Sequence, residues 1–131
     1  MSISNRKVVI VGAGHVGSHV GYALISQSLA DEIVYIDSDR AKAVAQALDL
    51  TDATNYLPVR TKVTAGDYSD AKDAQIMIIA AGPLPTGNQT RMDTLGQTIA
   101  ILKDVTKSIK ESGFDGIIIS ISNPADVIAH Y

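Results

Sequence analysis

A glycine-rich turn directly after an apolar segment constrains the fold of this 131-residue chain more than any other feature. The apolar run 8–11 leads into Gly12, Gly14 and Gly17, which have the spacing G-x-G-x-x-G. In this spacing the first glycine allows a tight turn off a strand, the second leaves room for a ligand against bare backbone, and the third lets the following helix pack closely on the sheet. The pattern therefore predicts a strand, a turn and a helix, with an anion-binding helix N-terminus at their junction.

An acidic residue follows at the distance that this glycine pattern requires. Asp37 ends the next apolar run, 33–36, and lies twenty residues after Gly17. A carboxylate at that point accepts hydrogen bonds from the two hydroxyls of an adenosine ribose and repels a 2'-phosphate. Ser38 and Asp39 add no positive charge that would favour the phosphate. We therefore expect the chain to bind NAD rather than NADP, with an ordinary glycine turn as the less favoured alternative.

Composition argues against several other classes of function. The net charge is −3 and no basic cluster occurs, so we expect neither nucleic acid nor an anionic membrane as a partner. The chain has no cysteine, which excludes disulfides, thiolate catalysis and cysteine-based zinc sites. The N-terminal apolar run is too short for a signal peptide or a membrane span, so we expect a cytoplasmic location.

Five apolar runs alternate with segments of helical periodicity. Four of the runs are continuous rather than alternating, which is typical of parallel strands covered by helices on both faces. We therefore expect an α/β fold with a doubly wound parallel sheet of the Rossmann type, as one domain over residues 1–131. The expected strands are 8–11, 33–36, 62–64, 76–80 and 117–121, and the expected helices are 16–29, 40–52 and 94–110, the last ending at Gly113.

One irregular segment follows the fourth expected strand. Residues 81–93 are rich in proline and glycine and cannot form a regular element. Their place at the carboxyl end of a parallel strand puts them over the crevice where ligands bind in such sheets. A guanidinium near the end of this loop, that of Arg91, can clamp a carboxylate or polarise a carbonyl as the loop closes. From the loop alone, a hydrated surface arginine is the favoured interpretation.

Other polar residues have candidate roles. Asn123 follows the fifth strand and suits the cap of a helix that starts at Pro124. Its amide also faces the crevice, where it can hydrogen-bond nicotinamide or a substrate oxygen.

His15 and His19 have metal-ligand spacing on a helix, but no third ligand completes a site, so we expect no metal. We expect His15 beside the phosphates and His19 on the helix surface. An acidic run before the fourth strand is expected to be solvated and without a role: Asp67, Asp70 and Asp73.

These motifs together resemble the lactate/malate dehydrogenase superfamily. The similarity spans nearly the whole chain and is most specific in the loop that ends in Thr90-Arg91 and in the Ser-Asn-Pro-x-Asp of segment 119–127. Within the superfamily, Glu111-Ser112-Gly113-Phe114 and the Ile-Ser-Asn-Pro segment are similar to the L-2-hydroxyisocaproate and L-lactate dehydrogenase branch. The resemblance implies an NAD-dependent oxidoreductase that transfers a hydride between NADH and a small 2-oxo acid, such as 2-oxoisocaproate or pyruvate.

The resemblance also assigns roles to individual residues. Arg91 would polarise the reacting carbonyl as the catalytic residue, Asn123 would contact nicotinamide and substrate, and Asp37 would hold the adenosine ribose. Pro85 takes the place of the glutamine of lactate dehydrogenases and the arginine of malate dehydrogenases, which predicts a larger or more apolar 2-oxo acid. The implied substrate-binding residues are Arg91 and Asn123, and the implied cofactor-binding residues are Gly12, Gly14, His15, Val16, Gly17, Asp37, Ala81, Gly82 and Asn123.

The chain ends before several parts that the resemblance implies. A sixth strand and the substrate domain would follow Tyr131, and with them the family's proton-relay histidine and aspartate and its carboxylate-binding arginine. None of the three histidines matches those motifs, and His130 is expected to lie in a frayed end. We therefore expect this chain alone to be inactive. It is either the cofactor domain of a 2-hydroxyacid dehydrogenase or a non-catalytic NAD-binding module, with another Rossmann oxidoreductase as the weaker option.

The missing sixth strand predicts self-association. In the strand order 3-2-1-4-5-6 it would cover the fifth strand, so residues 117–121 form an apolar, unpaired edge. The helix expected over 40–52 is similar to the one through which family members dimerise and gives an alternative route. By either route, we expect a homo-oligomer.

Overall fold

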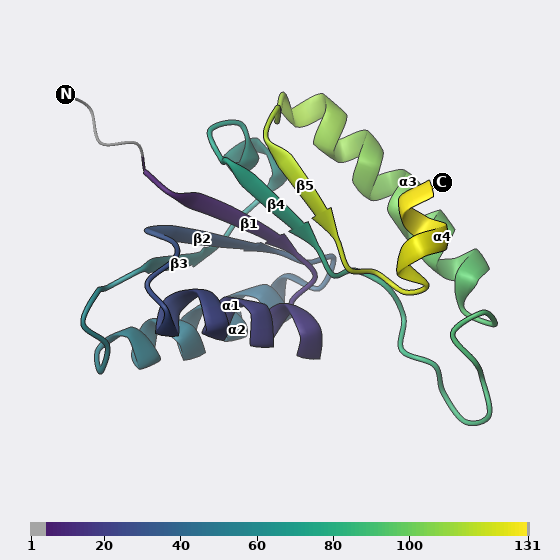
Figure 1. The fold of residues 1–131 in the computed structure, drawn as a ribbon, viewed down its shortest axis with the longest axis horizontal. Coiled ribbons are helices and arrows are strands. Elements are labelled where there is room, and N and C mark those ends of the chain that lie inside the picture. Colours follow the sequence, from purple (N-terminus) through teal and green to yellow (C-terminus); the bar gives the residue numbers. More distant parts are fainter. Residues whose placement is uncertain (1–4, 131) are drawn as a thin grey trace.

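The computed structural model describes residues 5–130 as a five-stranded parallel sheet with helices on both faces (Figure 1), in the strand order β3-β2-β1-β4-β5. The strands are β1 (Lys7–Val11), β2 (Glu32–Ile36), β3 (Lys62–Ala65), β4 (Ile76–Ile79) and β5 (Ile117–Ser120). The helices are α1 (His15–Ser26), α2 (Arg40–Thr54), α3 (Leu95–Ser112), α4 (Ala125–His130) and the short 3-10 helix η1 (Tyr68–Ala71). The predicted doubly wound sheet is confirmed. Residues 1–4 and 131, the two ends of the predicted domain, lie outside the described residues.

Two apolar clusters hold the sheet between its helices. One face packs against α1 and α2 through residues that include Ile10, Ile33, Tyr35, Ala43 and Leu50. The other face packs against α3 and η1 through residues that include Val9, Val34, Met77, Leu102 and Val105. Since the central strands are buried on both faces, their apolar runs are continuous, and this is why the sequence pattern predicted a parallel sheet.

One predicted helix end is correct, one is wrong, and one helix was not predicted. α3 ends at Gly113 as predicted, since this glycine has the left-handed φ of 78° that is typical of a helix C-terminus. α1 ends at Ser26 rather than at Leu29, because Ser28 has a φ of 55° and turns the chain toward β2. The helix η1 was not predicted.

The last helix begins later than predicted. α4 starts at Ala125, and its first hydrogen bond joins the N–H of Ile128 to the carbonyl of Pro124 at 2.9 Å. The residue whose carbonyl accepts that bond is the N-cap, so Pro124 is the cap and the prediction that Asn123 caps this helix is wrong by one residue. His130, which was expected to be frayed, is the last residue of α4.

Three acidic residues that were given no role make structural contacts. Asp67 and Asp70 form a reciprocal capping box at the start of η1. Asp73 accepts a hydrogen bond of 2.7 Å from Nζ of Lys7, the first residue of β1, which is only 6% exposed. This bond from the Lys7 ammonium holds the pKa of Asp73 below its ordinary value. All three aspartates are exposed, so the prediction of a solvated acidic run is confirmed, but the expectation that they have no role is wrong, because each makes a structural contact.

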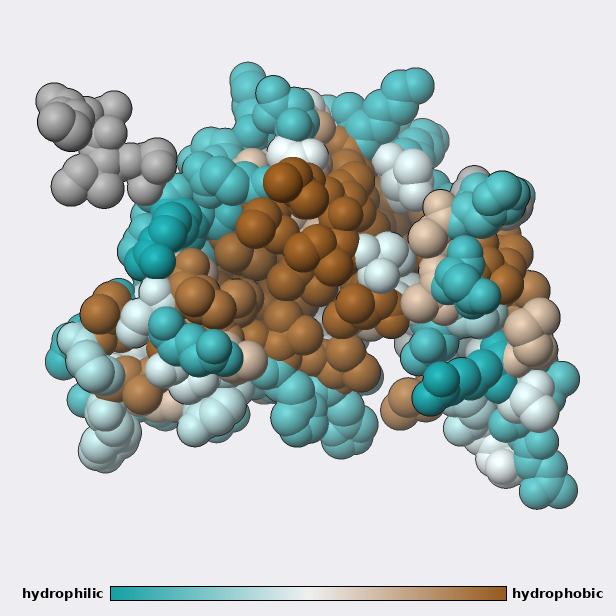
Figure 2. Space-filling view, viewed as in Figure 1, coloured by the Kyte–Doolittle hydropathy of each residue, from teal (hydrophilic) through white to brown (hydrophobic). Residues whose placement is uncertain are grey.

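β5 is an edge strand, hydrogen-bonded only to β4 among the described residues. Its side chains Ile117, Ile118 and Ile119 are 65%, 48% and 44% exposed. Ile117 and Ile119 are in register with Ile76 and Ile78, which places them on the sheet face that carries α1. Figure 2 shows apolar residues gathered over β4 and β5. The predicted apolar, unpaired edge is confirmed for the described part of the chain.

Candidate functional site

The three glycines of the turn after β1 have different surroundings. Gly12 has a φ of 107°, and a Cβ added there would lie 2.8 Å from the carbonyl of Ala80, next to β4. A Cβ added at Gly17 would overlap the carbonyl oxygen of Gly12. A Cβ added at Gly14 meets no atom within 4 Å. The fold therefore requires Gly12 and Gly17 to be glycine, whereas Gly14 borders open space that a ligand can enter.

Helix α1 begins beside this open space. Gly14 is the N-cap and has no side chain to bond the first turn. The first helical bond runs from the N–H of Ser18 to the carbonyl of Gly14 at 2.9 Å. The N–H groups of His15, Val16 and Gly17 precede this bond, so the helix itself gives them no acceptor. Together with the helix dipole, these donors attract an anion.

The carboxylate of Asp37 lies at the same junction, directly after β2. Its Oδ2 accepts a hydrogen bond of 2.8 Å from the N–H of Ala13, and its Oδ1 accepts one of 2.8 Å from the N–H of Asp39. These two backbone donors fix the orientation of a half-buried side chain. A carboxylate offers about four acceptor positions, so about two remain for a vicinal diol.

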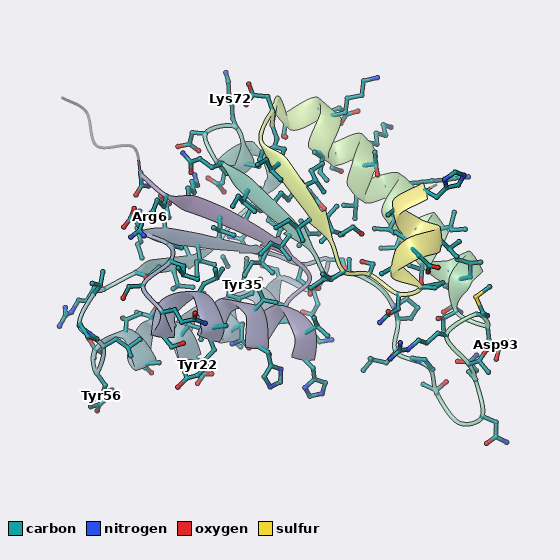
Figure 3. All side chains as sticks on the ribbon, viewed as in Figure 1. Arg6, Tyr22, Tyr35, Tyr56, Lys72 and Asp93 are labelled. Atoms are coloured by element: carbon teal, nitrogen blue, oxygen red, sulfur yellow. The ribbon has the colours of Figure 1, made fainter. Side chains whose placement is uncertain are left out.

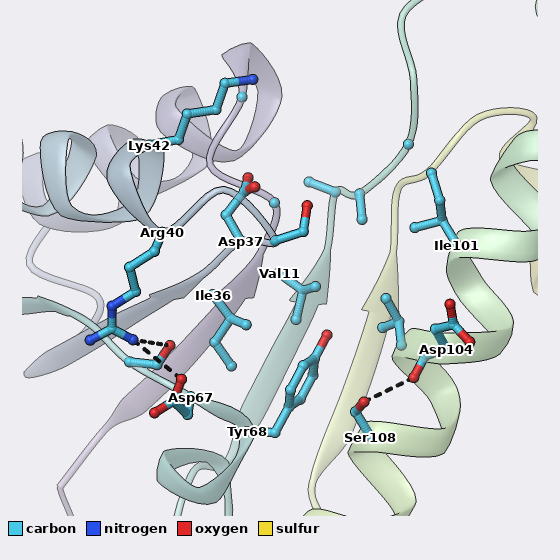
Figure 4. Close-up of a pocket in the computed structure, with 18 of the residues that line it drawn as sticks. Val11, Ile36, Asp37, Arg40, Lys42, Asp67, Tyr68, Ile101, Asp104 and Ser108 are labelled. Carbon is cyan, nitrogen blue, oxygen red and sulfur yellow. Dashed lines mark hydrogen bonds and ion pairs between the residues drawn. The ribbon is translucent and has the colours of Figure 1, made fainter.

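A cavity of about 610 Å³ extends from the glycine turn across the carboxyl ends of the strands to α3 (Figure 4). Gly14 and Asp37 line one side, Ile101 of α3 lines the other, and Tyr68 of η1 stands between them. Burial, aided by the negative charge of Asp37, raises the pKa of Tyr68, so its hydroxyl stays protonated at neutral pH. The cavity thus combines a flat apolar part, suited to a base, with a polar part suited to a ribose and a phosphate.

A second cavity, of about 850 Å³, adjoins the first at Gly14. It lies between the start of α1, the exposed side of α2 and the loop after β4. The residues that line it include His15, Val16, Lys42, Gly82 and Leu84. Both His15 and Val16 are exposed at the start of α1, next to the free N–H groups.

Two cations beside Asp37 were not singled out from the sequence. The guanidinium of Arg40, the first residue of α2, pairs with Asp67 at 3.2 Å and reaches the carbonyl of Gly66 at 3.4 Å. Lys42 lines both cavities, and its ammonium has no hydrogen bond or ion pair within residues 5–130. The sequence did contain a signal for these two cations, because both residues follow Asp37 closely. Their direction depends on where α2 starts, which the carboxylate of its N-cap, Asp39, determines.

The structure does not bring every predicted site residue to the cavities. Ala81 and Gly82 line the first cavity, and Gly82 lines the second as well. Arg91 and Asn123 are exposed and line neither cavity. The guanidinium of Arg91 makes no hydrogen bond or ion pair with any described residue. The backbone carbonyl of Arg91 accepts a hydrogen bond of 2.9 Å from Oγ1 of Thr94. Figure 1 shows the loop that carries Arg91 extended away from the sheet.

Ser122 is a buried residue that the sequence interpretation missed. Its hydroxyl donates a hydrogen bond of 2.6 Å to the carbonyl of Ala81, and the residue is 4% exposed. This bond joins the ends of β4 and β5 just before Gly82 and Asn123. The sequence signal was its place as the first residue of the Ser-Asn-Pro-x-Asp motif, which pointed to the family but gave Ser122 itself no role.

The sequence analysis expected neither a metal site nor a membrane-spanning segment. The described residues contain no group of three His, Cys, Asp or Glu side chains that could hold a metal ion. Nδ1 of His19 lies 2.6 Å from the carbonyl oxygen of His15, and His19 is exposed on α1. No helix within residues 5–130 is long and apolar enough to cross a membrane.

The parallel sheet, the glycine turn and the carboxylate at the end of the second strand define a dinucleotide-binding domain of the Rossmann class. Residues 6–131 match the family model described as lactate/malate dehydrogenase, NAD binding domain. The chain therefore belongs to the lactate/malate dehydrogenase family as its NAD-binding domain, and NAD is its cofactor.

Similar proteins of known name are L-lactate dehydrogenases. L-lactate dehydrogenase 3 of Bacillus cereus is 44% identical over 130 residues, which cover 99% of this chain and 41% of that protein. L-lactate dehydrogenase 1 of Bifidobacterium longum is 42% identical over 131 residues, which cover 100% of this chain and 42% of that protein. This chain thus spans about 41% of the length of these curated relatives.

Solved structures of lactate dehydrogenases have the same fold. The minor L-lactate dehydrogenase from Enterococcus mundtii, in its ligand-bound form, superimposes with a TM-score of 0.87 at 40% identity, over 93% of this chain and 39% of that one. The enzyme from Cryptosporidium parvum, complexed with lactic acid and nicotinamide adenine dinucleotide, superimposes with a TM-score of 0.90 at 28% identity, over 98% of this chain and 41% of that one.

Proposed function

We propose that this chain supplies the NAD-binding domain of an NAD-dependent L-2-hydroxyacid dehydrogenase that interconverts a 2-oxo acid and its 2-hydroxy acid. The observation that carries the proposal is the open space over Gly14, bounded by the free N–H groups of α1 and by the Asp37 carboxylate. The names of the similar proteins support a hydroxyacid substrate. When bound, NADH supplies the hydride for the carbonyl carbon of the 2-oxo acid.

On the cofactor side, each group has a distinct task. The N–H groups of α1, with His15 and Val16 beside them, hold the pyrophosphate against the bare backbone of Gly14. Asp37 uses its two remaining acceptor positions for the ribose hydroxyls. Tyr68 and Ile101 enclose the adenine in the first cavity.

On the substrate side, the proposal assigns catalysis to Arg91. Its guanidinium has no hydrogen-bond or ion-pair partner among residues 5–130, and it is carried by a loop that can close over the strand ends. There it would hydrogen-bond the substrate carbonyl oxygen and stabilise the negative charge that develops on it. The amide of Asn123 would contact the nicotinamide and the same oxygen, and the bond between Ser122 and Ala81 keeps Asn123 close to the end of β4.

We further propose that residues 1–131 form one domain of a longer protein, because the relatives are more than twice as long as the matched segment. The proton relay and the anchor for the substrate carboxylate would then lie outside this domain. A non-catalytic NAD-binding module is the alternative. The longer form distinguishes the two when it is mixed with NADH and a panel of 2-oxo acids, because a dehydrogenase should oxidise NADH with at least one acid, whereas a non-catalytic module should oxidise none. The chain alone should bind NADH without turnover in either case.

Replacing Gly14 with alanine tests the cofactor site without disturbing the fold. Gly14 has a φ of −80°, which alanine adopts freely, and the added methyl meets no protein atom. We expect the affinity for NADH, measured by calorimetry, to fall by roughly tenfold, because the methyl occupies the space of the pyrophosphate. Gly96→Ala, at an open position in α3, is the matched control and should bind like the wild type. Undiminished affinity in Gly14→Ala would refute the proposed site.

Pro85 determines the substrate preference in this proposal. Proline offers neither an amide donor nor a charge to a second carboxylate, so the longer protein should prefer an apolar 2-oxo acid to oxaloacetate. Pro85→Arg adds a cation on the exposed loop and should raise kcat/KM for oxaloacetate by roughly tenfold or more. The check is kcat/KM for both substrates in both proteins, and a wild type that prefers oxaloacetate would contradict the assignment.

A further inference from the structure

Tyr35 is a buried phenol to which the proposed function gives no role. It is 0% exposed, the largest of the fully buried side chains, and it lies between β2 and α1 (Figure 3). Its hydroxyl donates a hydrogen bond of 2.9 Å to the carbonyl oxygen of Gly17. Burial raises the pKa of the phenol, so the hydroxyl remains a neutral donor. A single polar atom in an apolar interior is thus directed at the third glycine of the turn.

The sequence of α1 makes room for this hydroxyl. A Cβ added at Gly21 would overlap Oη of Tyr35. Glycine in the middle of a helix is unfavourable by itself, because it loses more backbone freedom on folding than alanine does. Its presence next to the phenol therefore has a packing reason, and Tyr35 and Gly21 act as a matched pair.

One side chain of β2 and one directly after it hold the start of α1 and the turn before it. Asp37 accepts from the N–H of Ala13 at 2.8 Å, and Tyr35, two residues earlier, donates to the carbonyl of Gly17 at 2.9 Å. The free N–H groups of His15, Val16 and Gly17 lie along the chain between the two bonded atoms, the nitrogen of Ala13 and the carbonyl oxygen of Gly17. The Asp37 carboxylate, which we propose holds the ribose, and the turn that we propose holds the phosphate are thus fixed relative to each other through β2 and the residue that follows it.

We propose that Tyr35 is a positioning residue for the pyrophosphate, whose hydroxyl holds the first turn of α1 at the distance from Asp37 that a dinucleotide requires. The inference rests on the proposed function. Tyr35 holds the carbonyl of Gly17, and the N–H of Gly17 is the last of the free donors. A shift of this carbonyl therefore also moves the N–H donor. A ligand without phosphate contacts Asp37 and the base side of the cavity and does not depend on this turn.

The ratio of affinities for ADP and adenosine tests the proposal. In Tyr35→Phe, which keeps the ring and removes the hydroxyl, we expect the affinity for ADP to fall roughly fivefold, the factor that one net hydrogen bond provides, while the affinity for adenosine stays unchanged. Tyr22→Phe is the matched control, because Tyr22 is on α1, the helix that Tyr35 contacts, but is 56% exposed and points away from the sheet (Figure 3). NMR titration measures both ligands. Equal losses for the two ligands, or no loss for either, would overturn the assignment.

Gly21→Ala tests the same contact from the helix side. The added methyl should push the hydroxyl off the Gly17 carbonyl while every residue of the cavity is retained. We expect the same fall in the ADP-to-adenosine ratio, and an unchanged ratio would overturn the proposal even if Tyr35→Phe failed to fold. A wild-type chain that binds neither ADP nor NADH would instead refute the proposed function itself, so the two failures are distinct.

Discussion

Asp37 shares the first cavity with two cations, Arg40 and Lys42. Its carboxylate repels a 2'-phosphate, whereas the two cations would attract one. Asp37→Ser removes the repulsion and leaves the cations, so the affinity for NADPH relative to NADH should rise by roughly tenfold or more. Competition binding measures this ratio, with Asp115→Ser, on the exposed loop before β5, as the control. A constant ratio would mean that groups other than Asp37 determine the choice of cofactor.

The ion pair of Lys7 and Asp73 is a second prediction at the residue scale. Asp73→Asn leaves the buried Lys7 ammonium with only Glu32, at 4.0 Å, among residues 5–130. Because solvent screens the exposed carboxylate, the change should lower the free energy of unfolding by about 1 kcal/mol at pH 7. The folded pKa of Asp73 lies below its ordinary value of 3.8, so its contribution is complete above that value and is lost as the pH falls through the lower folded pKa.

Urea unfolding of wild type and Asp73→Asn at pH 7 and at pH 2 measures this effect. The difference between the two proteins should be present at pH 7 and should shrink at pH 2. Asp115→Asn, at an exposed position that forms no ion pair within residues 5–130, should match the wild type at both pH values. A difference that persists undiminished in acid would assign the loss to packing rather than to charge.

At the scale of elements, local patterns predicted the strands and the turn, and tertiary contacts determined the rest. Four of the strands come from continuous apolar runs, and all five strands lie within one residue of their predicted bounds. Periodicity alone extended α1 too far, because the turn at Ser28 depends on how the chain enters β2. η1 depends on the capping box of Asp67 and Asp70, and the start of α4 depends on one backbone bond to Pro124, and periodicity contains no information on either.

The same distinction applies to the site. The glycine turn and Asp37 could be predicted because their roles follow from short, defined spacings. The bond from Tyr35 to Gly17 joins residues 18 apart, and the bond from Ser122 to Ala81 joins residues 41 apart. Contacts at such separations exist only after the sheet has formed. The sequence therefore predicted the groups that we propose to contact a ligand, but not the groups that hold them in place.

For the whole molecule, the two edges of the sheet have opposite character. β3 presents the charged and exposed Lys62, a side chain that discourages pairing with another strand. β5 presents three exposed isoleucines and an unpaired backbone edge within the described residues. A separate apolar surface lies on α2, where Val44 and Leu48 are 41% and 61% exposed. Self-association of this chain can therefore use the β5 edge or α2.

We expect the 131-residue chain to self-associate mainly through β5, because that edge combines apolar side chains with free backbone groups. Ile117→Lys places a charge at the most exposed of its three isoleucines and should shift the chain toward monomer in sedimentation velocity experiments at high concentration. Leu48→Lys, a matched change on α2, should leave the association intact. If only Leu48→Lys dissociates the oligomer, α2 is the interface, and a wild type that stays monomeric throughout contradicts both routes.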